Sequence, residues 1–137
     1  RPEASAESIV DGWLHTGDMG YYDEDGYLYL IDRKKDMYIS GGENVYPAEV
    51  EDAIMGFDRV GDVGVIGIPD EKWGEVGMAI VVPKPGEEVT EESVIEFCKG
   101  RLAKYKVPKK VLFTDELPRT ATGKILKKAL KAQYTPE

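Results

Sequence analysis

The sequence predicts an α+β fold in which a central sheet is flanked by helices. Strand-like and helix-like segments are mixed along the 137 residues without strict strand–helix–strand alternation, which favours this class over a parallel sheet. Apolar residues make up 42% of the chain and charged residues 32%, as expected for a core with a hydrophilic surface. The length suits one compact domain, or a small domain with an attached stub.

The first elements are predicted to be a loop and a hairpin. Residues 1–12 have no helix start and are expected to form a loop or a cut edge. Residues 20–31 fit a β-hairpin, because aromatic and aliphatic residues flank a turn in which Gly26 supplies the positive φ that such turns need. Further short strands are expected at residues 37–40, 62–68, 78–82 and 111–114.

Helices are predicted to begin at three places. Pro47 suits a first helical turn, and the apolar residues after it recur at helical spacing, namely Val50, Ala53, Ile54 and Phe57. Thr90 is expected to cap a second helix, on whose apolar face Cys98 lies as a small core residue. A third helix is expected from Lys124 onward, with a buried side made of Ile125, Leu126, Ala129 and Leu130.

Composition excludes several classes of protein. One cysteine and one histidine exclude a disulfide framework and a cysteine- or histidine-rich metal site, so no metal site is predicted. The cysteine usage indicates a reduced, cytoplasmic setting. No apolar run approaches the ~20 residues of a membrane helix, and the first residues do not resemble a signal peptide.

Charge is distributed unevenly along the chain. Residues 1–98 carry 7 basic and 23 acidic side chains, whereas residues 99–131 carry 11 basic and 2 acidic ones. Such a basic segment can serve nucleic acid, an acidic membrane surface or a phosphorylated small molecule. The alternative is a solvated helix face that balances the acidic half.

Three segments place small residues beside charges, as a backbone that approaches a ligand requires. In residues 12–20, the Asp18 carboxylate follows a tight turn and is able to accept hydrogen bonds from a ribose diol; the alternative is an Asx-turn. In residues 32–51, a charged cluster precedes a glycine pair. In residues 118–128, Lys124 sits on a loop tip where it can stabilise developing negative charge. Solvated surface loops are the alternative for both.

Together, in this order and spacing, the three segments resemble the adenylate-forming superfamily of acyl-CoA synthetases, luciferases and peptide-synthetase adenylation domains. The resemblance covers residues 13–130. It implies a two-step reaction, in which a carboxylate attacks ATP to give an acyl-adenylate and pyrophosphate, and a thiol then attacks the adenylate. The string MYISGGENVYPAEVE looks like fatty-acyl and aryl-CoA ligases, and a long-chain fatty-acid–CoA ligase is the member the chain most resembles.

The resemblance implies a role for each motif. Asp18 and Arg33 would bind the nucleotide, and Lys35 stands at the family's hinge. Lys124 would be the catalytic lysine of the adenylation step. The channel for the pantetheine arm of coenzyme A would be lined by Ser40, Gly41, Gly42 and Trp73. The phosphates of coenzyme A would be attracted by Lys104, Lys106, Lys109 and Lys110. One departure is Asp32, which stands where many relatives have glycine.

The resemblance also implies that the chain is a fragment, inactive alone. Residues 1–34 would be the terminal hairpin segment of a large N-terminal domain, and residues 35–137 a mobile C-terminal lid. ATP and coenzyme A are the implied co-substrates, with Mg²⁺ held by the absent domain. The implied partners are that domain and a carboxylic acid, a fatty acid first; nucleic acid is not expected. Peripheral membrane association through the acyl substrate is left open.

Two other functions remain open at this point. An adenylation domain would pass the acyl group to a carrier protein in place of free coenzyme A. A non-enzymatic module with a basic tail would bind nucleic acid in a salt-dependent way, against which the net charge of −8 argues.

Overall fold

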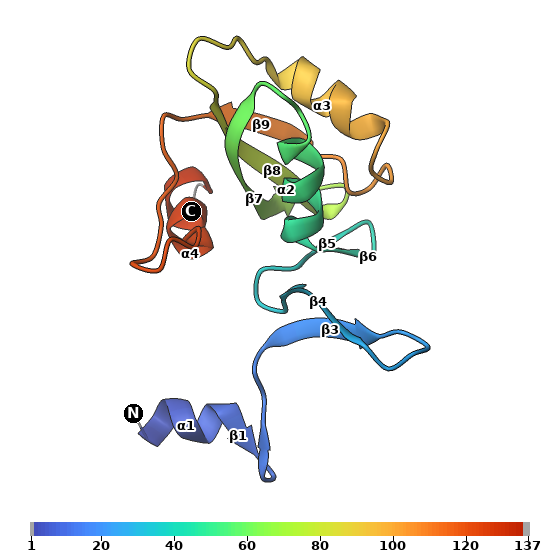
Figure 1. Cartoon of the computed structure of the whole chain (residues 1–137), viewed down its shortest axis with the longest axis vertical. Helices are drawn as coiled ribbons and strands as arrows, with labels where there is room; N and C mark the ends of the chain where they lie inside the picture. The colour runs from blue at the N-terminus through green and yellow to red at the C-terminus, as the bar shows by residue number, and fades with distance from the viewer. Residues whose placement is uncertain (1, 136–137) are drawn as a thin grey trace.

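The structure is a computed structural model that describes residues 2–135. Residue 1 and residues 136–137, at the outer ends of the two expected domains, lie outside the described residues. Figure 1 shows a body with a sheet and helices, from which an arm of small elements extends. The arm comprises residues 2–33 and the body residues 37–135, and the chain between them runs through a turn.

The arm contains one short helix and two hairpins. Helix α1 (Pro2–Ser8) leads into β1 (Ile9–Val10), which pairs antiparallel with β2 (Trp13–Leu14). The longer hairpin pairs β3 (Asp18–Tyr22) with β4 (Leu28–Arg33), which confirms the hairpin expected at residues 20–31. The expected loop at the start is wrong, since α1 occupies it. A helix of small and polar residues has no apolar face, so its sequence gives no periodic signal.

The body is built on a five-stranded sheet. Strands β7 (Val60–Asp70) and β8 (Gly74–Pro83) form a long antiparallel hairpin, and β9 (Lys110–Phe113) runs parallel to β8 along its other edge. Strand β5 (Tyr38–Ser40) joins the start of β8 and pairs antiparallel with β6 (Glu43–Val45). The expected strands are confirmed, and β6 is an additional one whose three residues are too few to show an alternating pattern.

Helices cover both faces of the sheet (Figure 1). Helices α2 (Pro47–Met55) and α3 (Glu91–Lys99) bury Val50, Ile54, Val94 and Cys98 in one core cluster, and α4 (Lys127–Tyr134) buries Leu130 in a second. Cys98 is a core residue as predicted, and burial raises the pKa of its thiol to about 11. The predicted central sheet between helices is therefore confirmed.

The third helix starts later than the sequence predicts. Arg119 pairs with Ile125 in an antiparallel bridge that closes a turn at residues 121–123, and α4 begins only at Lys127. Leu126 is exposed, whereas Ile125 packs beside Leu130 against the sheet. Hydrogen bonding across this small loop therefore overrides the helical spacing on which the prediction depended.

A tyrosine anchors the chain where it enters the body. The ring of Tyr38 fills a slot over Gly67 and Gly77, where an added Cβ would lie 2.4 and 2.3 Å from tyrosine atoms. Burial raises the pKa of the Tyr38 hydroxyl above its usual range. Only glycine leaves room for the ring at these two positions, so β5 has a fixed position directly after the connecting turn.

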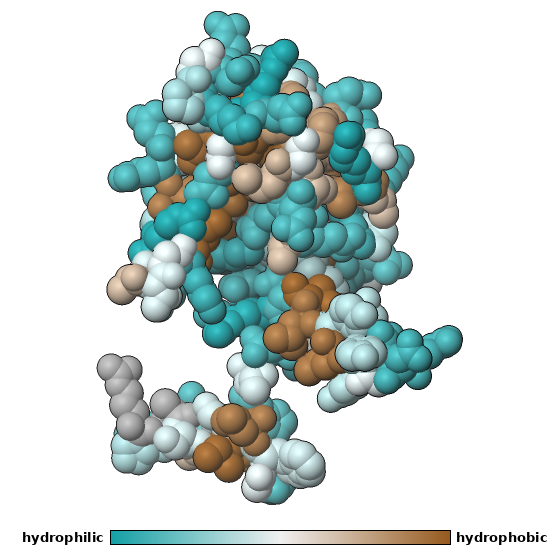
Figure 2. All heavy atoms as spheres, in the orientation of Figure 1, coloured by the Kyte–Doolittle hydropathy of each residue, from teal (hydrophilic) through white to brown (hydrophobic). Residues whose placement is uncertain are grey.

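Apolar side chains are exposed on the arm. Figure 2 shows hydrophobic patches on it, and Trp13 and Leu30 are 76% and 69% exposed. Among the described residues, every buried apolar side chain lies at residue 38 or later. None of the described helices is long and apolar enough to cross a membrane.

Candidate active site

The end of the long hairpin holds an acidic and a basic side chain together. The register of β3 and β4 pairs Asp18 with Arg33, and the Asp18 Oδ1 lies 3.5 Å from the Arg33 Nε. The turn before Asp18 is closed by the Thr16 hydroxyl, which accepts a hydrogen bond from the Asp18 N–H at 3.2 Å. The carboxylate therefore faces Arg33, not its own backbone. Both side chains are partly exposed, so the pair contributes little stability.

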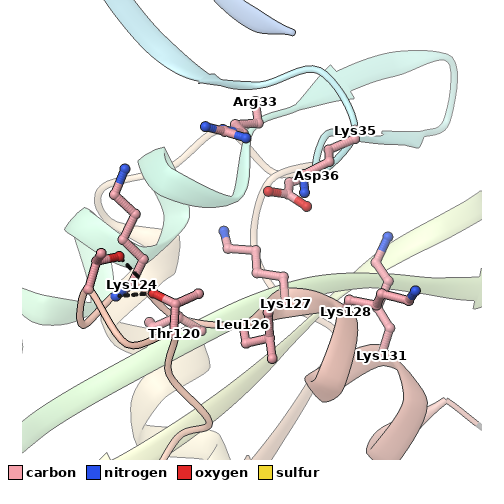
Figure 3. Close-up of a pocket in the computed structure, with 11 residues that line it drawn as sticks. Arg33, Lys35, Asp36, Thr120, Lys124, Leu126, Lys127, Lys128 and Lys131 are labelled. Atoms are coloured by element: carbon pink, nitrogen blue, oxygen red, sulfur yellow. Dashed lines mark hydrogen bonds between the residues drawn. The ribbon is translucent and has the colours of Figure 1, made fainter. Parts of the chain in front are cut away.

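Lys124 lies on a tight loop with a fixed backbone. Its N–H donates to the Thr120 Oγ1 at 3.1 Å, and its carbonyl accepts from the Thr120 N–H at 2.8 Å. Gly123 has a φ of 83°, a conformation that side chains disfavour. The Lys124 side chain itself is exposed and points toward Arg33 in Figure 3. An exposed side chain thus extends from a hydrogen-bonded loop.

Two ion pairs attach this loop to the body. The Arg119 guanidinium contacts the Asp62 carboxylate on β7 and donates to the Gly123 carbonyl oxygen. Beyond the loop, the Lys127 Nζ lies 2.9 Å from the Glu51 Oε1, and both side chains are largely buried. Sequence reasoning missed these supports, because nothing local links residues 57 or more positions apart.

The same Glu51 ties three elements together. Its Oε1 also accepts a hydrogen bond from the Val65 N–H at 2.8 Å, so α2, β7 and the start of α4 meet at one carboxylate. Lys127 lies in the first turn of α4, where the helix dipole disfavours a cation. The nearby carboxylate offsets that cost, and the start of α4 is thereby fixed three residues after Lys124.

A basic cleft of about 720 Å³ lies between the connecting turn and the Lys124 loop (Figure 3). Six basic residues and one acidic residue line it, namely Arg33, Lys35, Lys124, Lys127, Lys128, Lys131 and Asp36. A smaller cleft of about 290 Å³ brings Asp18, Arg33 and Lys124 together. A positive cleft of this kind attracts a multiply charged anion such as a polyphosphate. Lys128 and Lys131 were missed, although their helical spacing to Lys127 places them on one side of α4.

A second arrangement surrounds the glycine pair. Gly41 and Gly42 have φ values of 62° and 89°, and they form the turn between β5 and β6. The Gly41 N–H donates to the Trp73 carbonyl oxygen at 2.9 Å, and an added Cβ on Gly41 would lie 2.6 Å from the Trp73 ring. Ser40 is 2% exposed. The backbone and the indole are therefore stacked without a gap.

Next to this turn lies a third cavity of about 160 Å³. It is lined by Ser40, Trp73, Lys104, Tyr105 and Lys109. Lys104 and Lys109, for which the resemblance implies an attraction for the phosphates of coenzyme A, both line this cavity. Lys106 differs, since its Nζ lies 2.7 Å from the Glu49 Oε1 and this pairing raises the pKa of Lys106. Tyr105 was not singled out from the sequence, because a lone tyrosine carries no motif.

The predicted site residues therefore fall into two groups. Asp18, Arg33, Lys35 and Lys124 line the clefts on one side, and Ser40 and Trp73 line the third cavity, with which those clefts share no lining residue. Gly41 and Gly42 lie in the turn at this cavity.

Lys35 occupies the turn that joins the arm to the body, where the N–H groups of Asp36 and Met37 both donate to the Arg33 carbonyl oxygen. The described residues contain no group of three or more His, Cys, Asp or Glu side chains that would hold a metal ion.

Comparisons with known proteins place the chain in a family. Residues 49–124 match the AMP-binding enzyme C-terminal domain. The long-chain-fatty-acid–CoA ligase FadD13 of Mycobacterium tuberculosis is 56% identical over 135 residues, which are 98% of this chain and 27% of that protein. The chain thus spans about a quarter of that relative's length.

Solved structures give the same result. The fatty acyl CoA synthetase of Mycobacterium tuberculosis is 56% identical, with a TM-score of 0.76 over 98% of this chain and 27% of that one. The o-succinylbenzoate CoA synthetase MenE of Bacillus subtilis, in complex with the acyl-adenylate intermediate, is 45% identical. Its TM-score is 0.88 over 100% of this chain and 28% of that one.

Proposed function

Because this chain belongs to the family of AMP-binding enzyme C-terminal domains, we propose that it is the C-terminal part of an ATP-dependent acid–CoA ligase. In the first step a substrate carboxylate attacks the α-phosphorus of ATP and displaces pyrophosphate. In the second, the thiol of coenzyme A attacks the acyl carbonyl and AMP leaves. The observation that carries the proposal is the smaller cleft, in which Asp18, Arg33 and Lys124 converge, beside the basic cleft that Arg33 and Lys124 also line.

In the first step these three residues act on the nucleotide. The Asp18 carboxylate accepts hydrogen bonds from the ribose hydroxyls, and Arg33 contacts the ribose or a phosphate. Lys124 bridges the attacking carboxylate and a phosphate oxygen, so that its charge stabilises the negative charge that develops there. The hydrogen bonds between Thr120 and the Lys124 backbone support this role, because they fix the point from which the side chain reaches into the cleft.

In the second step the glycine turn replaces Lys124. Gly41 packs directly on the Trp73 ring and Gly42 faces open space, so the turn presents bare backbone that a thin pantetheine arm can approach. Ser40 lies in the wall of the neighbouring cavity. Lys104 and Lys109 supply positive charge for the phosphates of coenzyme A. Since the two groups of residues share no cavity, the body has to turn about Lys35 between the steps.

The likeness to solved structures supports the first-step arrangement. The TM-score is 0.88 for the acyl-adenylate complex at 45% identity and 0.76 for the fatty acyl CoA synthetase at 56% identity. A relative with higher sequence identity but a lower TM-score is expected when its arm and body have similar structures but a different relative arrangement. We therefore take the described arrangement as the one that serves adenylation.

The exposed arm supports the expected domain boundary. Residues 1–34 carry exposed apolar side chains between Ile9 and Leu30, a pattern that marks an interaction surface. We propose that they belong to a large N-terminal domain, which also supplies the acyl pocket and the Mg²⁺ ligands, and that residues 35–137 form the mobile lid. A cytoplasmic setting and peripheral membrane association through the acyl substrate remain predictions.

The substrate class is the finer part of the proposal. A fatty acid is favoured by the 56% identity with a long-chain-fatty-acid–CoA ligase. An aryl acid is the second candidate, favoured by the likeness to the o-succinylbenzoate CoA synthetase. In both cases the acid is activated by the same residues of this chain, because the acyl pocket lies outside it.

The test uses the full-length protein that contains this chain. Pyrophosphate release and coenzyme A thioester formation are measured with short, medium, long and aromatic acids, and this chain alone serves as the control. We expect thioester with at least one class of acid and none with the chain alone. Pyrophosphate without a coenzyme A thioester would favour transfer to a carrier protein, and thioester formed by the chain alone would refute the fragment assignment.

A further inference from the structure

An aspartate at the end of the arm caps a helix of the body. Asp32 lies in β4, one residue before the end of the hairpin, and is half-buried. Its Oδ2 accepts a hydrogen bond from the Ala48 N–H at 2.9 Å, and its Oδ1 accepts from the Arg33 N–H at 2.6 Å. Both carboxylate oxygens are thus engaged, one on each side of the connecting turn.

Helix α2 has no cap of its own. The residue at its N-cap position, Tyr46, makes no capping hydrogen bond with its side chain, and Pro47 at the first position has no N–H. The first N–H that the helix leaves unpaired is therefore that of Ala48, and Asp32 accepts it from another element 16 residues away. A negative charge there also suits the positive end of the helix dipole.

This hydrogen bond crosses the joint between arm and body. Contacts between the long hairpin and the body are made by β4 and α2. Across the described residues, Asp32–Ala48 is the one hydrogen bond or ion pair that connects residues 18–33 with residues 38–135. The other hydrogen bonds at the joint join Lys34 to Gly17 or lie within the turn at Arg33. A rotation about Lys35 would carry Ala48 with the body and leave Asp32 with the arm, so it has to break this bond.

We propose that Asp32 is a positioning residue that favours the adenylation arrangement. Asp32 lines the smaller cleft, but both of its carboxylate oxygens accept backbone N–H groups. It acts through α2, which holds the body against the arm with Lys124 opposite Asp18 and Arg33. Its effect on catalysis rests on the proposed function, whereas its effect on the joint does not. Capping bonds of this kind shift an equilibrium by about 2- to 30-fold.

The test separates the joint from the chemistry. In this chain, Asp32→Ala is compared with Asp52→Ala, which removes an exposed acid from the same helix. The readouts are hydrogen exchange at the Ala48 amide and the distance distribution between spin labels on Tyr27→Cys and Glu96→Cys. We expect about 2- to 30-fold faster exchange and a broader distribution for Asp32→Ala alone. Asp32→Asn, which keeps an oxygen acceptor, should fall between it and the unchanged chain.

In the full-length protein the same variants are assayed for each half-reaction. Asp32→Ala should slow adenylation about 2- to 30-fold and leave thiolysis of a supplied acyl-adenylate unchanged or faster. Equal losses in both steps, or unchanged Ala48 exchange and label distances, would overturn the proposal. If Asp32→Ala loosens the joint but the full-length protein adenylates no acid, the role of Asp32 at the joint stands and only the proposed function is refuted.

Discussion

The arm and the body use apolar residues in opposite ways. The body buries them on both faces of its sheet, with Ile54 and Leu130 fully enclosed on opposite sides. The arm exposes Trp13 and Leu30, although its long hairpin is rich in aromatic and aliphatic residues. Apolar content alone therefore does not reveal a core, because burial depends on what packs against the strand.

The difference also explains where the candidate site lies. Asp18 and Arg33 come from the arm and Lys124 from the body, so the cleft they line depends on how these two parts are joined. A stable body beside a weakly attached arm allows the two to change their relative position without loss of the core. The same property would harm an ordinary binding pocket, which needs its walls fixed.

The largest expected effect compares two leucines. Leu130→Ala should lower the free energy of unfolding of the body by about 2–5 kcal/mol, because it leaves a cavity under the sheet. Leu30→Ala on the arm should change it by no more than about 0.5 kcal/mol, since that side chain is exposed. Chemical denaturation followed by circular dichroism measures both, and similar losses would mean that the arm belongs to the same core.

A smaller effect is expected at the loop that supports Lys124. Arg119→Ala removes partly exposed contacts to Asp62 and Gly123, so the unfolding free energy should fall by no more than about 1 kcal/mol. Amide exchange at Lys124 should nevertheless become faster, because the loop loses its attachment to β7. Arg101→Ala, which removes an exposed arginine that contacts Phe97 after α3, is the control. Equal exchange at Lys124 in both variants would contradict a supporting role.

Local patterns in the sequence were enough to predict much of the fold. Pro47 and the apolar residues at helical spacing after it predicted α2, and the apolar runs around Gly64 and Met78 predicted the two strands of the central hairpin. The start of α4 was missed because hydrogen bonds between Thr120 and Lys124 override local periodicity. Helix α1 has no apolar stripe, so no pattern distinguishes it from a loop.

The sequence motifs of the candidate site were predictable, but the long-range contacts that hold those motifs in place were not. Asp18, Arg33 and Lys124 do meet in one cleft, although their roles stay predictions. The contacts of Asp62 with Arg119 and of Asp32 with Ala48 join distant parts of the chain. In a sequence with 26 acidic and 18 basic side chains, many different ion pairs between distant residues are possible. Only the fold determines which of these pairs form.

The measurement that tests the central claim most directly compares two variants of the full-length protein in separate half-reactions. Lys124→Ala should slow pyrophosphate-forming adenylation by about 10²–10³-fold and leave thiolysis of supplied acyl-adenylate intact. Gly41→Ala, whose Cβ would lie 2.6 Å from the Trp73 ring, should slow thiolysis and spare adenylation. This opposite pattern is what two separate groups of residues predict, and equal losses in both steps for both variants would contradict it.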